Sequence, residues 1–373
     1  MKIIILGPSW PYRGGIAAFT ERLAHQYISE GHEVEVLTFT LQYPSFLFPG
    51  KTQYSTEPAP EGLRIRRMIN SCNPLSWLRT GFYIRKRKPD MVITPFWLPF
   101  MAPAFGTITR IAKRKGLRRV AILHNLIPHE HRIGDKQFAG YFIHSNDAFV
   151  TLSKSVLEDI DSFDPKRKRP RAFSPHPLYD HYGDLLPITE ARAMLNLPAE
   201  GPVVLFFGFI REYKGLDLLL DAMADERLKQ MNVKLIVAGE FYGDPAPYHE
   251  QLKRLQLGDR VSLHTDFIPD HEVNRYFCAA DIIAQPYKSA TQSGVTQIAF
   301  HFEKPMLVTN VGGLPEIVPN GKAGFVVEPN AKSIADALVH FFADNCSASL
   351  TAGVREEKKK YAWSNLTAAI ARL

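Results

Sequence analysis

Residues 282–309 read IIAQPYKSATQSGVTQIAFHFEKPMLVT, a pattern typical of a strand, a turn, a helix and a second strand. The apolar run 282–284 is short enough for a buried strand, and 306–309 is a second run of this kind. The Thr-Gln-Ser-Gly turn at 291–294 carries no charge and offers only hydroxyls, amides and backbone N–H groups. A strand, a crossover helix and a further strand form the unit from which parallel sheets are built.

The same alternation repeats along the chain. Strand-like runs in the first half lie at 2–6, 33–39, 64–69, 91–94, 119–124 and 148–152. Those in the second half lie at 203–207, 233–238, 261–264, 282–284, 306–309 and 325–327. Most are separated by segments long enough for helices, such as 16–30 and 102–116. We therefore expect an α/β fold with two doubly wound, Rossmann-like domains, one in each half.

The length of the chain also favours two domains, because 373 residues exceed what one hydrophobic core usually holds. The stretch SPHPLYDHYGDLLP, residues 174–187, is rich in proline and turn residues and marks the boundary. We expect an N-terminal domain at 1–182 and a C-terminal domain at 183–354. Residues 355–373 read as an amphipathic helix that packs either on its own domain or against the first. Ligands of open α/β sheets bind beyond the carboxyl ends of the strands, so a central cleft between the two sheets is the expected site.

The composition, 45% hydrophobic and 22% charged, is that of a globular protein. No run of eighteen apolar residues occurs, and the chain enters a strand-like run at once, so we expect neither a signal peptide nor a membrane span. Three scattered cysteines fit a reducing compartment. These features predict a cytoplasmic protein.

The net charge of +7 is unevenly distributed. Residues 1–180 hold 26 Lys and Arg against 15 Asp and Glu, and the remainder holds 19 against 23. Basic runs lie at 85–88, 113–115, 118–119 and 166–169. They are either solvated helix ends and loops, or a face that meets anions. No nucleic-acid motif accompanies them, so the second interpretation favours an anionic membrane surface, with the protein peripheral on its inner face, or a phosphate-bearing acceptor.

Two stretches of the first half follow strands and could meet a ligand. In GPSWPYRGGIAAF, residues 7–19, Gly14 and Gly15 precede a helix, which is either a simple turn or a place where a ligand approaches the backbone. The dinucleotide spacing G-x-G-x-x-G is absent. His124 and Asn125 stand at the end of a strand, as a structural pair or as groups that face the cleft.

Metal binding is not predicted. His124 is followed by His129, Glu130 and His131, but Pro128 breaks the helical spacing that paired metal ligands use. The only Asp-x-Asp, at 159–161, lies on a helical pattern and reads as a solvated face.

The stretch FFGFIREYKGLDLLLDA, residues 206–222, carries the clearest signal in the second half. Gly208 ends a strand, and Lys214 opens an amphipathic helix three residues after Arg211. Cations beside the positive end of a helix make a receptor for phosphate oxygens, although a surface pair of basic residues is the alternative. The strand, glycine and helix pattern recurs in VAGEFYG, 237–243, and in TNVGGLPEIV, 309–318.

Taken together, these stretches resemble the retaining glycosyltransferases of family 4, which have the GT-B fold. The resemblance covers essentially the whole chain. It rests on the order and spacing of KGLDLLLDA (214–222), VAGE (237–240), AADIIAQPY (279–287), KPMLVTNVGGLPEIV (304–318) and YAWSNL (361–366).

The resemblance implies a metal-independent hexosyltransferase that acts with retention and needs no cofactor beyond a nucleotide-diphosphate sugar as co-substrate. The C-terminal domain would bind this donor, the basic N-terminal domain a glycan or lipid-linked acceptor, and the terminal helix would cross back to the first domain. Cell-surface polysaccharide synthesis is the expected setting. The implied catalytic residues are Arg211, Lys214 and His124. The implied donor-binding residues are Gly15, Gly208, Glu240, Gln292, Ser293, Gly294, Val295 and Glu316. The implied acceptor-binding residues are Gly14 and Asn125.

The chain lacks the pair of glutamates that the family usually carries. Counting back from Pro305, their positions fall at Ala290 and Ile298, or one later at Thr291 and Ala299. Gln292 and Gln297 are neutral substitutes, and Glu240 and Glu316 are acidic candidates in neighbouring loops. The family arginine usually follows the strand-end glycine directly, but this chain has Phe209 there, and Arg211 is the nearest cation. Lys214 stands where the family has its lysine.

Two alternatives to transfer stay open. Loss of both carboxylates would fit a catalytically silent sugar-nucleotide binder or partner subunit. An isomerising enzyme on the same fold would need no acceptor. Donor base, donor sugar, acceptor and linkage are not encoded in any motif that we find.

Overall fold

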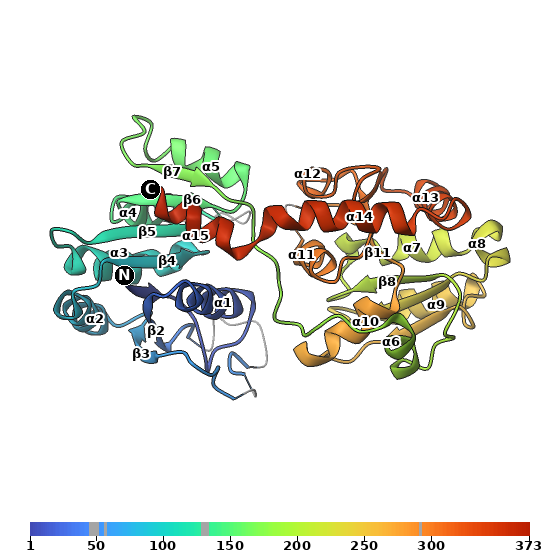
Figure 1. Cartoon of the computed structure of the whole chain (residues 1–373), viewed down its shortest axis with the longest axis horizontal. Coiled ribbons are helices and arrows are strands. Elements are labelled where there is room, and N and C mark those ends of the chain that lie inside the picture. Colours follow the sequence, from blue (N-terminus) through green and yellow to red (C-terminus); the bar gives the residue numbers. More distant parts are fainter. Residues whose placement is uncertain (45–51, 56–57, 128–133, 291–292) are drawn as a thin grey trace. The chain divides into compact units, whose positions relative to one another are not determined.

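The computed structural model describes residues 1–44, 52–55, 58–127, 134–290 and 293–373. By contacts the chain forms two compact units (Figure 1). The first contains Met1–His176 together with Ala362–Leu373, and the second contains Pro177–Tyr361. The chain therefore leaves the first unit at 176, six residues before the boundary expected at 182, and returns to it at 362.

The first unit contains a seven-stranded parallel sheet in the order β3-β2-β1-β4-β5-β6-β7. The strands are β1 (Lys2–Leu6), β2 (Glu33–Leu41), β3 (Ile65–Asn70), β4 (Met91–Phe96), β5 (Arg118–Leu123), β6 (Ala148–Thr151) and β7 (Arg171–Phe173). In register, Ile3 of β1 pairs with Val34 on one side and with Met91 on the other. The strand order reverses between β1 and β4, which is where doubly wound sheets bind ligands.

The second unit contains a six-stranded parallel sheet in the order β10-β9-β8-β11-β12-β13. The strands are β8 (Val203–Phe207), β9 (Lys234–Ala238), β10 (Val261–His264), β11 (Ile282–Gln285), β12 (Met306–Thr309) and β13 (Gly324–Val327). Its order reverses between β8 and β11, so the two sheets share one topology. Two doubly wound α/β sheets, as expected from the alternation in the sequence, are confirmed.

The strands read as continuous apolar runs because helices cover both faces of each sheet (Figure 1). Along β1, Ile3 and Ile5 join one hydrophobic core, while Ile4 and Leu6 join the core on the opposite face. All four side chains are fully buried. The strands of the second sheet alternate between two cores in the same way.

Helices connect most successive strands in both units. In the first they are α1 (Gly15–Ser29), α2 (Pro74–Arg87), η2 (Pro99–Met101), α3 (Ala102–Ala112), α4 (Asp135–Ile143), α5 (Lys154–Asp161) and α15 (Trp363–Ala371). In the second they are α6 (Ile188–Met194), η3 (Glu212–Lys214), α7 (Leu216–Met223), α8 (Glu226–Gln230), α9 (Ala246–Arg254), η4 (Asp270–Glu272), α10 (Val273–Ala279), α11 (Gly294–His301), α12 (Leu314–Ile317), α13 (Ala331–Ala343), α14 (Ser347–Lys358) and η5 (Lys359–Tyr361). No helix among these described residues is long and apolar enough to cross a membrane.

The carboxyl-terminal stretch differs from the single helix expected at 355–373. It is divided between α14 and α15, because the backbone is extended rather than helical at Ala362. The carbonyl of Tyr361 accepts a hydrogen bond of 3.0 Å from the Leu178 N–H, and the Tyr361 side chain packs on Phe300. These contacts hold the end of α14 in the second unit. In α15, Trp363 and Leu366 lie on one buried face and pack into the core of the first unit.

One strand was missing from the sequence prediction. β7 is only three residues long and follows the basic run 166–169, so it lacks the apolar alternation by which strands are found.

Candidate active site

The loops after β8 and β11 lie side by side, because these strands are neighbours at the point where the strand order reverses. Gly215 makes this approach possible: a Cβ at this position would lie 2.0 Å from the Pro286 carbonyl oxygen. Its φ of +67° also favours glycine. The Lys288 N–H then donates to the Tyr213 carbonyl at 2.7 Å. The two loops are therefore closely packed, and their side chains share one region.

Lys214 is held at the centre of this region, at the end of η3. Its side chain is buried, and a Cβ added to Gly208 would lie 2.9 Å from its Nζ and 3.8 Å from the Val295 Cγ2. Burial, and then the charge of Arg211, lower the pKa of Lys214 from 10.5 to about 8. No carboxylate in the described part of the chain pairs with this ammonium group. An unpaired buried cation is costly, so the site is suited to receive an anion.

Arg211 is fixed beside it by an aromatic ring. Its guanidinium carbon lies 3.8 Å from the centroid of the Tyr242 ring, and its buried Nε finds no hydrogen-bond partner in the parts of the chain that the structure describes. The ring is placed by the backbone, since Tyr242 donates its N–H to the Ile210 carbonyl at 3.0 Å. Glu240 lies on the same loop and accepts from the Ile210 N–H at 2.8 Å through its carbonyl. Arg211 and Glu240 are thus brought together with Lys214 around the end of β8.

The amino-terminal end of α11 faces the same region. Ser293 caps the helix: its Oγ accepts the Val295 N–H at 3.2 Å and lies 3.1 Å from the hydroxyl of Tyr287. The ring of Tyr287 lies 5.8 Å from the Nζ of Lys214, so this tyrosine links the cation to the helix end. The Val295 N–H, expected to meet a diphosphate, is occupied by the cap, whereas the Gly294 N–H has no partner among the described residues.

Gly294 is required for space rather than for its backbone angles. Its φ is not among the positive values of the described glycines, so a left-handed conformation is not the reason for it. A Cβ at this position would meet the Tyr179 ring at 3.0 Å. Tyr179 comes from the proline-rich stretch after the first unit, and no local motif relates it to residue 294.

The other predicted donor-binding residues of the second unit are less central. Glu316 is exposed on the short helix α12, which follows Gly312 and Gly313. The preceding strand end is tied to the β11 loop, because Thr309 Oγ1 donates to the Tyr287 carbonyl at 2.6 Å. Gln292 and Thr291 lie outside the described residues.

The positions expected for the family glutamates are apolar packing positions. Ile298 is 5% exposed and Ala299 is fully buried, both in the core of the second unit, and Ala290 packs against the same core. Gln297 is buried, and its Oε1 has no hydrogen-bond partner among the described residues. Its carboxamide therefore does not take the place of a family glutamate on the surface of the site.

In the first unit, His124 follows β5 and lies within an aromatic cluster. Its ring centroid is 4.6 Å from that of Phe19 and 5.8 Å from that of His176. Burial, and then the neighbouring His176, hold the pKa of His124 well below 6.5, so the imidazole is neutral at physiological pH. Its buried Nε2 has no hydrogen-bond partner in the described part of the chain.

Three further predicted residues of this unit are exposed. Gly14 adopts a φ of +114° and precedes α1, which begins at Gly15 and has no side-chain cap. Asn125 follows His124 and is exposed. These groups come from the loops after β1 and β5 of one sheet.

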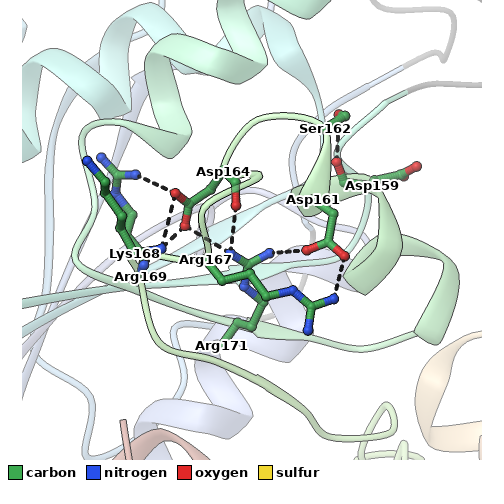
Figure 2. A network of polar contacts seen from close by, with 8 residues as sticks. All are labelled: Asp159, Asp161, Ser162, Asp164, Arg167, Lys168, Arg169 and Arg171. Carbon is green, nitrogen blue, oxygen red and sulfur yellow. Dashed lines mark hydrogen bonds and ion pairs between the residues drawn. The ribbon is translucent and has the colours of Figure 1, made fainter.

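No metal centre is found: among the described residues, no three His, Cys, Asp or Glu side chains could hold an ion together. His129, Glu130 and His131 lie outside these residues. Asp161 and Asp164 belong to a network of ion pairs, beside which the Ser162 hydroxyl donates to the Asp159 carbonyl (Figure 2). There Arg171 bridges Asp161 at 2.6 Å and Asp164 at 2.9 Å.

The same network neutralises part of the basic run 166–169. Arg167 pairs with Asp161 at 2.8 Å, and Arg169 pairs with Asp164 at 3.4 Å (Figure 2). Burial alone would raise the pKa of Asp164, but N–H donors from Arg169 and Lys168 and the two arginine charges lower it overall. This run is therefore mainly structural.

Tyr179, Tyr242 and Tyr287 were not singled out from the sequence, although each contacts a predicted site residue. Their only local signal is that each lies shortly after glycine or proline in a loop.

Two family models match most of the chain. Residues 13–173 match the family model described as Glycosyltransferase Family 4, and residues 201–344 match the model described as Glycosyl transferases group 1. A D-inositol 3-phosphate glycosyltransferase of Xylanimonas cellulosilytica is 27% identical over 305 residues, covering 75% of this chain and 70% of the relative. The matches with two further relatives of that description span 38% and 46% of their lengths.

Solved structures share the whole fold. Anabaena HepE in complex with UDP has a TM-score of 0.73 at 18% identity, with 100% of this chain and 99% of that chain covered. HepE has also been solved with UDP-glucose. WaaG, a glycosyltransferase involved in lipopolysaccharide biosynthesis, gives a TM-score of 0.63 at 16% identity, with 100% and 99% covered.

Proposed function

Since this chain belongs to family 4 of the glycosyltransferases, we propose that it transfers a hexose, with retention, from a nucleotide-diphosphate sugar to a glycan or lipid-linked acceptor. The relatives support a nucleotide sugar as donor, because HepE binds UDP and UDP-glucose. The lipopolysaccharide role of WaaG supports an acceptor in cell-surface polysaccharide synthesis.

The observation that carries the proposal is the unpaired ammonium group of Lys214. It is buried at the reversal point of the second sheet, with Gly208 against it and the end of α11 nearby. A diphosphate would supply the missing negative charge. The Gly294 N–H and the Arg211 guanidinium are further donors around it.

These groups would act on the leaving group. In the transfer, the bond between the sugar C1 and the diphosphate oxygen breaks, and a new bond forms between C1 and the acceptor oxygen on the same face. The acceptor proton passes to a phosphate oxygen or to solvent. Negative charge grows on the diphosphate as the first bond breaks, and cations already placed in a water-poor site stabilise it most there. We expect this charge to be met by Lys214 and Arg211 rather than by a metal ion.

The neutral His124 would contact the transferred sugar as a hydrogen-bonding group, not as a base or a cation. Its unpaired Nε2 is suited to a hydroxyl. Gly14, Gly15 and Asn125 would contribute exposed polar groups from the same sheet edge. Glu240 is the acidic side chain on the loop after β9, whose backbone pairs with the Arg211 loop at Ile210, and it is our first candidate to bind donor hydroxyls.

A silent sugar-nucleotide binder is the second candidate. The observation in its favour is that Ile298 and Ala290 pack into the core where the family has glutamates. Donor binding would then persist without transfer.

The test begins with donor binding by the full chain. UDP-, ADP- and GDP-sugars are compared by the shift they cause in thermal unfolding, since a ligand at 100 times its Kd stabilises a protein by about 2.7 kcal/mol. The donor that binds is then incubated with acceptor extracts, and released nucleoside diphosphate is measured. Binding with acceptor-dependent release supports transfer. Binding without release supports the silent binder, and no binding by any donor refutes both.

A further inference from the structure

The helix α2 has an apolar stripe on its outer surface. Leu75, Leu78 and Phe82 are 73%, 42% and 60% exposed. Their spacing of three and four residues places them on one face of the helix. α2 lies at the periphery of the first unit, between β3 and α3 (Figure 1). Three large apolar side chains in one exposed row are unusual for a surface helix.

The stripe is not the packing face of α2. The opposite face buries Thr80, Gly81 and Ile84. A Cβ on Gly81 would lie 2.6 Å from the Ile111 Cβ, so α2 is packed tightly against α3 through that side. The helix is also capped, because the Asn73 side chain accepts the Leu75 N–H at 3.0 Å. The fold therefore holds α2 in place with the stripe facing outward.

Cations flank the stripe on both sides. Arg79 and Lys86 follow Leu75 and Phe82 by four residues and lie on one side, while Arg85 lies on the other, next to Leu78 in projection. α2 contains no Asp or Glu. Among the described residues none of these three cations forms an ion pair, in contrast to Arg87, which faces Glu33 and Glu35.

A hollow of about 400 Å³ adjoins the amino-terminal end of the stripe, and Leu75 is part of its wall. Three arginines line it, namely Arg66, Arg67 and Arg79. Arg66 pairs with Glu35 at 3.3 Å, but the guanidinium of Arg67 donates to the carbonyls of Phe39 and Thr40 and keeps its charge. The remaining lining is polar: Thr40, Asn70, Asn73 and Ser76, apart from Met68 and Leu75. The hollow offers donors of the kind that bind phosphate.

From this arrangement we propose that α2 and the adjoining hollow dock the protein on an anionic phospholipid membrane. The stripe enters the interface between headgroups and acyl chains, as in amphipathic helices that lie in the plane of a bilayer. The flanking cations and the arginines of the hollow meet lipid phosphates. A membrane fits better than a second copy of the chain, because a twofold contact through α2 would bring the cations of each copy against one another. This docking is independent of the transfer reaction proposed above.

The test measures cosedimentation of the full chain with vesicles of phosphatidylcholine alone or with phosphatidylglycerol. We expect binding to the mixed vesicles that weakens with salt. Changing Leu75, Leu78 and Phe82 together to Ser should weaken it at least about tenfold, since each apolar side chain is removed from the interface. Changing Arg79, Arg85 and Lys86 to Glu should have a similar effect. All these residues are on the surface, and an unchanged melting temperature verifies that each variant is folded.

The matched control is Lys166→Glu with Lys168→Glu, two exposed cations of the same unit that lie away from α2. This control also lowers the net charge, so it separates a local effect of α2 from an effect of overall charge. If docking is local to α2, the control should bind nearly as well as the parent. Equal loss in the control would overturn the proposal in favour of a diffuse charge effect. Unaltered vesicle binding by the Ser variant would also overturn the proposal. So would the finding that the parent protein is a dimer in the absence of vesicles and that the Ser variant is a monomer.

Discussion

The carboxyl edges of the two sheets have the same topology, but one carries positive charge and the other is neutral. At the edge of the second sheet, Lys214 and Arg211 lie beside glycine-rich loops, and neither pairs with a carboxylate of the described residues. At the edge of the first, His124 is neutral and packed among aromatic rings. We infer from this difference that the second sheet would provide the charge for an anionic group, and the first would provide neutral contacts that determine shape.

The largest effect is expected at the charged edge. Lys214→Ala removes the cation expected to stabilise the leaving diphosphate, so turnover should fall about 30- to 1,000-fold, equivalent to roughly 2–4 kcal/mol. Steady-state kinetics with the donor identified above measure this. Lys229→Ala, on an exposed lysine of α8, is the control and should be neutral. Normal turnover by Lys214→Ala would assign the role to another cation, with Arg211→Ala as the next variant.

The Gly294→Val change tests whether the approach to α11 matters. The new side chain would meet the Tyr179 ring, where even a Cβ lies at 3.0 Å, and would crowd the free Gly294 N–H. We expect donor affinity to fall about 5- to 150-fold, because overpacking costs about 1–3 kcal/mol. Donor titration by calorimetry measures it. Combining the change with Tyr179→Ala should restore part of the affinity. If Gly294→Val binds donor normally, the turn is only a connection between strand and helix.

The pH dependence follows from the lowered pKa of Lys214, about 8. Lysine is charged below its pKa, so donor affinity should decline as pH rises through 8, by up to about tenfold per unit. The Lys214→Arg variant stays charged and should give a flatter profile. Stability has the opposite sign: the charged form is disfavoured in the fold, so this penalty is complete below pH 8 and disappears towards pH 10.5. A flat donor-affinity profile in the parent protein would contradict this interpretation.

At the neutral edge the expected effect is smaller. His124→Phe keeps the aromatic packing with Phe19 but removes the ring nitrogens. We expect turnover to fall about tenfold while binding of the free nucleoside diphosphate stays unchanged, since the histidine is assigned to the sugar. Comparing kcat with the Kd of the nucleoside diphosphate separates the two. Weaker diphosphate binding in this variant would remove the distinction between the edges.

Ser293→Ala should have the smallest effect. It removes the cap of α11, which costs about 1 kcal/mol of stability, and it frees the Val295 N–H. Activity should remain within a few fold of the parent, because the Gly294 N–H is untouched. Thermal unfolding and turnover are measured together. A large loss of turnover at unchanged stability would place the Ser293 hydroxyl on the substrate.

The strands, the position of Lys214 and its match to the family were predictable because they depend on local pattern. The periodicity of buried strands and the glycine before a helix are both read over a few residues. Contacts over long sequence separations were not: Tyr179 against Gly294 joins residues 115 positions apart. The exposed stripe on α2 was also hidden, because Leu75 and Phe82 look like core residues until packing shows which face is buried.

The hydrogen bond between the Leu178 N–H and the Tyr361 carbonyl has a consequence for the chain as an assembly. It joins the second residue of the second unit to the last, so residues 177–361 form an insertion whose two ends are fastened together within one domain. Units with adjacent ends are the ones that tolerate excision and circular permutation. We therefore propose that the second unit can be exchanged between related enzymes as one piece. If it binds the donor, as proposed above, such an exchange changes donor preference while the rest of the chain keeps its acceptor.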